Sequence, residues 1–177
     1  MPASNIRLIV TDVDGVWTDG SIVYQGDGHE IKAFNVRDGL GVKIAQKAGI
    51  IIAAVTSRRS PALERRCREL EIIHLVQGAA SKLAEMRKLA ATLEVPLDDV
   101  CYIGDDLPDL AAMSAAGFSA APSDATAEVR RVATLTLESR GGRGALRELV
   151  ELILRERGDW DRIVSEFSRE SVAVPNV

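Results

Sequence analysis

The chain has 177 residues, which is long for one small domain and short for two. We therefore expect one folded domain over residues 1–157, followed by a C-terminal tail over residues 158–177. The net charge of −4 argues against nucleic acid as the main partner. No apolar run approaches the ~20 residues that a membrane-spanning helix needs. With two cysteines and no secretory leader before Ile6, we expect reduced thiols and a cytoplasmic protein.

Apolar runs and helical segments alternate along most of the chain. Strands are predicted at residues 6–11, 50–55, 73–76, 100–103, 117–121 and 133–137. Helices are predicted at residues 39–48, 61–70, 80–94, 107–116, 124–131 and 143–157. Elements of this size in alternation predict an α/β fold, with a Rossmann-like, doubly wound and mostly parallel sheet whose crossovers are right-handed.

One segment breaks the alternation. Residues 21–24 and 30–34 are strand-like and flank a glycine-containing turn, so residues 20–36 are predicted to form a β-hairpin after the first strand. An isolated hairpin is marginally stable and exposes unpaired strand edges. We therefore expect this flap to pair with something outside its own sheet.

Carboxylates stand at the ends of two predicted strands. Asp12 and Asp14 close the first strand, and Asp105 follows the strand at residues 100–103. Ligands of open α/β sheets bind just outside the carboxyl edge of the strands. Mg²⁺ prefers one or two carboxylates together with phosphate oxygens and water. The pattern predicts a magnesium site, and Thr56 after the second strand and Lys82 early in a helix lie between its two acidic parts.

The order Asp-x-Asp, Thr, Lys and Gly-Asp-Asp-x-x-Asp resembles the haloacid dehalogenase-like phosphatases. The resemblance implies that Asp12 attacks phosphorus to form an aspartyl-phosphate, and that Asp14 protonates the leaving alkoxide and then activates water. Thr56 would hydrogen-bond a phosphoryl oxygen, and Lys82 would place a compact cation beside it. Asp12, Asp105 and the backbone carbonyl of Asp14 would hold Mg²⁺.

Many relatives in that superfamily carry a large cap domain, and this chain has no room for one. The stretch between Asp14 and Asp38 holds only the hairpin, and the stretch between Thr56 and Lys82 holds one helix and one strand. Such an enzyme acts on a macromolecule or borrows a cover from a neighbouring subunit. We expect an oligomer in which the hairpin makes the contact.

Finer motifs resemble the 3-deoxy-D-manno-octulosonate 8-phosphate phosphatases. The specific blocks are Phe-Asn-Val-Arg-Asp-Gly at residues 34–39 and Gly-Gly-Arg-Gly at residues 141–144. The resemblance covers residues 6–155 and implies a capless, cytosolic, Mg²⁺-dependent homotetramer that serves lipopolysaccharide synthesis. Its substrate is a small sugar-acid phosphate, with neither nucleic acid nor membrane as a partner.

The same resemblance implies a set of substrate contacts. The substrate carries a carboxylate and a phosphate at opposite ends, which suits fork-shaped arginine donors. Besides Asp14 and Lys82, the implied contacts are Asn35, Val36, Arg37, Asp38, Gly39, Lys43, Arg58 and Arg66.

Two other interpretations stay open. Trp17 resembles the sister phosphatases for nine-carbon acids, the 2-keto-3-deoxynononate 9-phosphate phosphatases, whereas Arg58 and Arg143 resemble the eight-carbon family. Ser57, in place of the usual glycine after Thr56, and the apolar tail depart from the eight-carbon pattern. The second alternative is a phospho-acceptor receiver domain, in which the acceptor aspartate lies mid-chain before the Thr and Lys; the motif order here favours the hydrolase.

Overall fold

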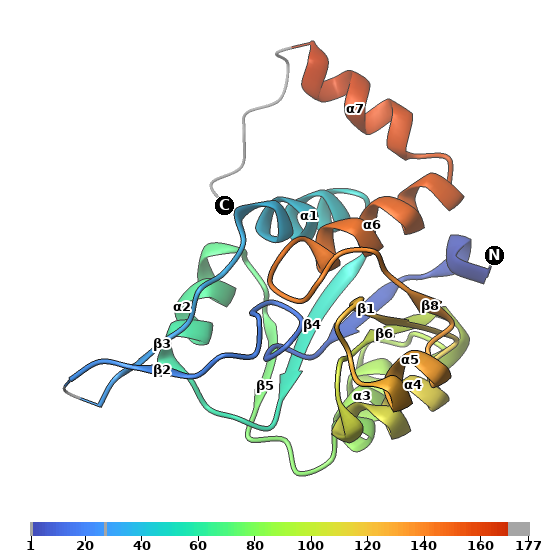
Figure 1. Cartoon of the computed structure of the whole chain (residues 1–177). Coiled ribbons are helices and arrows are strands. Elements are labelled where there is room, and N and C mark those ends of the chain that lie inside the picture. Colours follow the sequence, from blue (N-terminus) through green and yellow to red (C-terminus); the bar gives the residue numbers. More distant parts are fainter. Residues whose placement is uncertain (1, 27, 170–177) are drawn as a thin grey trace.

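The computed structural model describes residues 2–26 and 28–169. Its main sheet has the strand order β5-β4-β1-β6-β7-β8, and each neighbouring pair is parallel (Figure 1). The strands are β1 (Leu8–Thr11), β4 (Ile51–Thr56), β5 (His74–Gln77), β6 (Val100–Ile103), β7 (Phe118–Ala121) and β8 (Leu135–Thr136). The predicted α/β fold with a doubly wound sheet is confirmed, and the described part of this sheet is entirely parallel.

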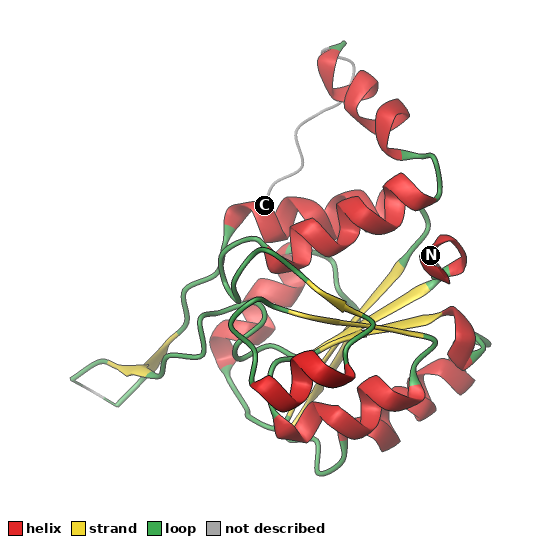
Figure 2. Cartoon of the chain, turned by 45° about the vertical axis from the view of Figure 1, so that its right-hand side comes forward, coloured by secondary structure: helices red, strands yellow, loops and turns green. Residues whose placement is uncertain are grey.

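Helices cover both faces of the sheet (Figure 2). On one face lie α1 (Val36–Lys47), α2 (Pro61–Glu69) and α6 (Ala145–Glu156). On the other lie α3 (Lys82–Thr92), α4 (Leu110–Ala115) and α5 (Ala127–Val132). Short 3₁₀ helices span η1 (Pro2–Asn5), η2 (Leu97–Asp99) and η3 (Leu107–Asp109). None of the helices in the described ranges is long and apolar enough to cross a membrane.

The core explains why the strands appear in the sequence as continuous apolar runs. Along β1, Leu8 and Val10 pack into the cluster under α3 and α4, while Ile9 packs into the cluster under α1 and α6. A parallel sheet that is covered on both faces needs apolar residues at every position of its strands. Cys67 and Cys101 are free thiols buried in this core, as expected.

The strand order reverses at β1. From β1 the chain runs outward to β4 and β5, and it then returns to β6 on the other side of β1. The last residue of β1, Thr11, is in register with Ala54 of β4 and Ile103 of β6. Because neighbouring crossovers diverge at such a reversal, a crevice opens outside the carboxyl ends of the two strands. The fold therefore places Asp12 and the loop after Ile103 at this crevice.

The predicted hairpin is confirmed, with shorter strands than its sequence suggests. Its strands β2 (Val23–Tyr24) and β3 (Glu30–Ile31) pair antiparallel in a separate sheet that projects from the body of the molecule (Figure 1). Ile22, Val23, Tyr24 and Ile31 all expose a large part of their apolar surface. The segments that connect β1 to α1 and α2 to α3 contain no cap domain in the described residues.

Two stretches differ from the sequence-based expectation. The helix predicted at 107–116 is divided into η3 and α4, because Asp106 forms a capping box with Asp109 that starts a separate turn. The tail contains a helix that was not predicted, α7 (Trp160–Ser168). The guanidinium groups of Arg147 and Arg155 lie over the ring of Trp160, 5.3 and 5.2 Å from its centre. Residues 170–177 of the predicted tail lie outside the described residues.

We predict that Leu149→Ala lowers the free energy of unfolding by about 2–5 kcal/mol, because the side chain is buried in α6 and its loss leaves a cavity. Ile73→Ala is the matched control, since that side chain is 84% exposed and should change stability by less than about 0.5 kcal/mol. Urea unfolding of both variants measures the difference. If both variants lowered the free energy of unfolding equally, the packing of α6 on the sheet would contribute little to stability.

Candidate active site

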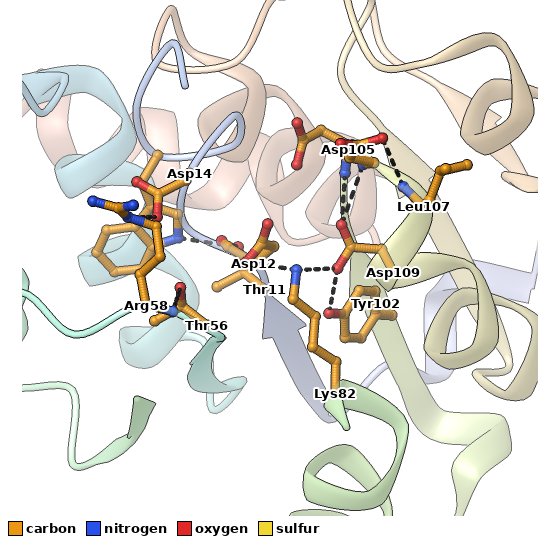
Figure 3. A network of polar contacts seen from close by, with 12 residues as sticks. Thr11, Asp12, Asp14, Thr56, Arg58, Lys82, Tyr102, Asp105, Leu107 and Asp109 are labelled. Carbon is orange, nitrogen blue, oxygen red and sulfur yellow. Dashed lines mark hydrogen bonds and ion pairs between the residues drawn. The ribbon is translucent and has the colours of Figure 1, made fainter. Parts of the chain in front are cut away.

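A buried lysine joins two carboxylates at the crevice between β1 and β6 (Figure 3). The ammonium nitrogen of Lys82 lies 2.9 Å from Asp12 Oδ1 and 2.7 Å from Asp109 Oδ1. Lys82 is the first residue of α3, and Ser81 caps that helix by accepting a hydrogen bond from the backbone of Ala84. The structure thus brings together Asp12 and Lys82, which the sequence places 70 residues apart.

Asp109 is the centre of this network, although it was not among the predicted site residues. Its Oδ1 also accepts a hydrogen bond of 2.7 Å from the hydroxyl of Tyr102. Its Oδ2 accepts hydrogen bonds from the backbone of Asp105 and Asp106, at 3.1 and 3.3 Å. Asp109 is fully buried. Asp109 is the last residue of the Gly-Asp-Asp-x-x-Asp motif, and that motif is the sequence signal that could have marked it as a site residue.

Asp105 completes a cluster that fits a divalent cation. Oxygen atoms of Asp12, Asp105 and Asp109 all lie within 4.8 Å of one another. Asp105 Oδ1 is buried and has no hydrogen-bond partner. Four donors already occupy Asp109, so Asp12 and Asp105 are the two carboxylates with oxygen atoms available to a metal. A hard cation that prefers carboxylate oxygens, such as Mg²⁺, suits this donor set.

The electrostatics of the cluster point to the same conclusion. Burial raises the pKa of Asp12 and Asp105, and the negative charge of Asp109 raises the pKa of both further. Burial lowers the pKa of Lys82, but the charges of Asp12 and Asp109 outweigh it, so the net shift is upward and the ammonium form is stabilised. One ammonium facing three carboxylates leaves excess negative charge, which a divalent cation would balance.

Asp14 belongs to a second ionic cluster, next to the first. Its Oδ1 pairs with Lys32, and its Oδ2 lies 3.6 Å from Arg58 Nε. Glu30 pairs with both cations, so the hairpin and the loop after β4 meet at Asp14. Lys32 and Glu30 were not predicted as site residues. They stand two positions apart in the strand-like segment at residues 30–34, with Ile31 between them, and this alternation is the signal that could have found them.

Thr56 ends β4, and its side chain is buried. Its hydroxyl oxygen accepts a hydrogen bond of 3.2 Å from the backbone of Arg58. The hydroxyl proton therefore remains available for donation to an anion. The family resemblance implies that Thr56 hydrogen-bonds a phosphoryl oxygen, and this contact remains a prediction.

The two family-specific sequence blocks contact each other. Asn35 caps α1 and donates a hydrogen bond of 3.3 Å to the backbone carbonyl of Gly142. The buried carboxylate of Asp38 accepts hydrogen bonds from the backbone of Gly144 and Arg147, at 3.1 and 2.8 Å. Asp38 therefore holds the start of α6, and the structure does not direct its carboxylate to the cluster around Asp12.

A close backbone approach explains a glycine in the second block. A side chain at Gly141 would place its Cβ 1.9 Å from the carbonyl oxygen of Gly15. The loop that precedes α6 therefore lies directly against the loop that carries Asp14. Only a residue without a side chain allows this contact.

The remaining predicted contacts lie on α1 and α2. Arg66 is buried over the ring of Phe34, 5.9 Å from its centre, and Gly39 leaves room for it, because a Cβ there would lie 2.3 Å from an Arg66 nitrogen. Lys43 forms an ion pair of 2.8 Å with Glu71. Two further positions, Val36 and Arg37, are exposed in the first turn of α1, and Arg37 lines a cavity of about 400 Å³.

Without metal, we predict that the protein becomes less stable as the pH rises. The folded protein has raised pKa values at Asp12 and Asp105, so it keeps protons that the unfolded chain releases near its ordinary value of 3.8. The two protonated carboxyl groups therefore contribute their full stabilisation below pH 3.8. This stabilisation is lost as the pH rises through the raised pKa values of Asp12 and Asp105. Mg²⁺ binds the deprotonated carboxylates and should restore stability, with more effect at about pH 8 than at about pH 5.

Urea unfolding at both pH values, with EDTA or with Mg²⁺, measures this effect. The Asp105→Asn variant is the control, because an amide neither titrates in this range nor replaces the lost carboxylate. It should lose most of the pH dependence and most of the gain from Mg²⁺. An identical gain from Mg²⁺ at both pH values in the wild type would contradict the prediction.

Comparisons with known proteins agree with this geometry. A family profile described as haloacid dehalogenase-like hydrolase matches residues 68–149. The 3-deoxy-D-manno-octulosonate 8-phosphate phosphatase KdsC of Salmonella typhi is 42% identical over 159 residues, which is 90% of this chain and 85% of that protein. The KdsC of Yersinia pestis is 45% identical over 152 residues, which is 86% of this chain and 81% of that protein.

A solved structure extends the agreement to three dimensions. The crystal structure of the 3-deoxy-D-manno-octulosonate 8-phosphate phosphatase of Moraxella catarrhalis, in complex with magnesium ion, phosphate ion and KDO, superposes with a TM-score of 0.92. It is 41% identical, and the match covers 94% of this chain and 95% of that chain. The chain therefore belongs to the 3-deoxy-D-manno-octulosonate 8-phosphate phosphatase family of the haloacid dehalogenase-like hydrolases.

Proposed function

We propose that the protein is a Mg²⁺-dependent phosphatase that converts 3-deoxy-D-manno-octulosonate 8-phosphate to 3-deoxy-D-manno-octulosonate and phosphate. The observation that carries the proposal is the Lys82 bridge between Asp12 and Asp109, beside the unpartnered oxygen of Asp105. Relatives that are 42% and 45% identical to this chain over the aligned residues are named for this reaction. Membership of a hydrolase family also removes the receiver-domain alternative.

Asp12 is the proposed nucleophile. One of its carboxylate oxygens attacks phosphorus while the bond between phosphorus and the sugar oxygen breaks. Asp14 gives a proton to the departing oxygen, so the sugar leaves as an alcohol and Asp14 becomes a carboxylate. Asp14 then takes a proton from a water molecule whose oxygen attacks phosphorus. The bond to Asp12 breaks, and inorganic phosphate leaves.

The other residues of the cluster would bind the metal ion and the phosphate group. Asp12, Asp105 and the backbone carbonyl of Asp14 are the proposed holders of Mg²⁺, which when bound supplies charge neutralisation to the phosphate oxygens. Lys82 is already fixed by Asp109, so its ammonium needs no reorganisation when phosphate arrives. Thr56 would donate its free hydroxyl proton to a phosphoryl oxygen.

We propose that Arg58, Arg66 and Lys43 bind the sugar acid, together with the segment from Asn35 to Gly39. Their positive charges suit a substrate that carries a carboxylate as well as a phosphate. Within that segment, Asp38 would act by anchoring α6, because its carboxylate is already bound to backbone donors.

The geometry of Trp17 removes one argument for a nine-carbon substrate. Its indole is buried, donates a hydrogen bond of 3.0 Å to the Thr11 hydroxyl, and packs edge-on against Phe34. Trp17 therefore ties the loop after β1 to the core, and this role does not depend on the length of the sugar.

The assembly is the remaining part of the proposal. The exposed apolar side chains of the hairpin, Ile22, Val23, Tyr24 and Ile31, support an oligomer in which hairpins pair. We propose a cytoplasmic homotetramer in which the hairpin of one subunit covers the site of its neighbour.

We predict that Asp12→Asn abolishes phosphate release, because an amide is a poor nucleophile and a weaker metal ligand. Asp98→Asn is the matched control, since this exposed residue lies at the amino end of β6, away from the crevice, and should keep wild-type activity. Wild-type kcat/KM should be higher for the eight-carbon acid phosphate than for the nine-carbon one. Substantial turnover by Asp12→Asn would refute the mechanism, and a preference for nine carbons would refute the substrate assignment.

We predict that replacing Ile22 and Val23 with Lys produces smaller species in light scattering and lowers activity on the sugar acid. Charges on the exposed apolar face of the hairpin would oppose its pairing with a second hairpin. The wild type, measured at the same concentration, is the reference. A wild-type chain that is a fully active monomer would contradict the proposed assembly.

A further inference from the structure

Lys32 differs from the rest of the hairpin in its burial. The apolar side chains of Ile22, Val23 and Tyr24 are largely exposed, whereas the Lys32 side chain is only 2% exposed. A buried ammonium is costly unless carboxylates compensate it. Lys32 has two such partners, Asp14 and Glu30, with Glu30 Oε1 at 3.1 Å. Its position is therefore set by the carboxyl group of Asp14 and by a residue of its own hairpin.

The two oxygens of Asp14 face different cations. Oδ1 pairs with Lys32, and Oδ2 lies 3.6 Å from Arg58 Nε (Figure 3 shows Asp14 beside Arg58). The Arg58 side chain is 39% exposed, so its longer contact is the weaker one and the more easily exchanged for a substrate. Lys32 is the buried and fixed partner. The rotation of the Asp14 carboxyl group is thus controlled mainly from the hairpin.

We propose that Lys32 is a positioning residue that orients the carboxyl group of Asp14 for proton transfer to the leaving group. A protonated carboxyl group keeps acceptor capacity, so Oδ1 can remain bound to Lys32 while Oδ2 carries the proton. Lys32 itself transfers no proton and contacts no reacting atom. The inference rests on the proposed phosphatase activity, because it concerns the acid of that reaction.

The leaving group provides a readout that a purely structural role would not change. p-Nitrophenolate leaves as a stable anion without a proton, whereas phenolate and a sugar alkoxide benefit from an acid. The ratio kcat/KM reports the steps up to the first irreversible one, which here is transfer of the phosphoryl group to Asp12. Loss of acid positioning should therefore lower kcat/KM for phenyl phosphate and leave p-nitrophenyl phosphate nearly unchanged.

The experiment compares Lys32→Met with wild type on phenyl phosphate, p-nitrophenyl phosphate and the eight-carbon acid phosphate, each with Mg²⁺. We expect Lys32→Met to lower kcat/KM at least about tenfold for the first and third, a part of the ~10²–10⁴ that general acid–base catalysis contributes. For p-nitrophenyl phosphate we expect a change within about twofold, and Lys32→Arg should recover part of the loss.

Two controls isolate the contact with Asp14. Lys47→Met removes a lysine of α1 that pairs with Glu166 at 2.7 Å and is 51% exposed, and it should change no substrate's kcat/KM. In an Asp14→Asn background, Lys32→Met should have no further effect on phenyl phosphate, because both changes remove the same function. If the Met variant does not fold, Lys32→Gln replaces it: a neutral amide binds the Asp14 carboxyl group more weakly than an ammonium, so we expect the same selective loss on phenyl phosphate at a smaller size.

Equal losses of kcat/KM on phenyl and p-nitrophenyl phosphate would overturn the inference, because Lys32 would then act on phosphate binding or on the fold. An additional loss in the Asp14→Asn background would overturn it as well. Either result leaves the proposed function intact, since the wild type still turns over. A wild-type protein that hydrolyses none of the three esters would instead refute the proposed function.

Discussion

The carboxyl edge of the sheet depends on the hydrogen bonds that Asp109 accepts. This fully buried carboxylate receives the ammonium of Lys82, the hydroxyl of Tyr102 and two backbone amides of the following loop. The donors come from α3, from β6 and from the loop that carries Asp105. A buried carboxylate with fewer partners would cost several kcal/mol of stability, so the four donors fix one another's positions. Asp109 thus helps to hold the ammonium of Lys82 where it also contacts Asp12.

This arrangement concentrates negative charge where the sheet is most enclosed. Asp12 and Asp109 share the ammonium of Lys82, Asp105 lies beside them, and burial raises the pKa of Asp12 and Asp105. A fold optimised for stability alone would not gather three carboxylates in this way. The loss of stability is offset when a divalent cation and a phosphate dianion bind, since the charged groups of the site are already arranged to receive them.

The sequence predicts the main sheet well, because strands buried on both faces appear as unbroken apolar runs. It predicts Asp12, Asp105 and Lys82 as neighbours for a related reason, since each stands where a strand ends or a helix begins. Helix α7 was missed although its apolar residues recur at 160, 163, 164 and 167, a helical spacing. A nine-residue helix is marginal alone, and here it depends on the packing of Trp160 against α6.

What the sequence could not provide are contacts between segments far apart in the chain. The expected contact of Asp38 with the substrate stays a prediction, but nothing local in the sequence indicates that its carboxylate accepts hydrogen bonds from the backbone of Gly144 and Arg147. Lys32 appears in the sequence as one more charge on an exposed hairpin, and only the folded chain buries it against Asp14. Such roles arise from tertiary packing, which local propensity and periodicity do not encode.

The contact between Gly141 and the carbonyl of Gly15 has a consequence for how this enzyme can diversify. Two backbones touch there with no side chain between them, so substitution cannot reshape that wall of the crevice. The hairpin and the residues after Thr56 instead present side chains to Asp14, as Lys32 and Arg58 do. We therefore expect substitutions that alter selectivity to be tolerated more readily among side chains of this kind than at the glycine contact, provided that Lys32 and Glu30 are kept, since they hold Asp14 and Arg58.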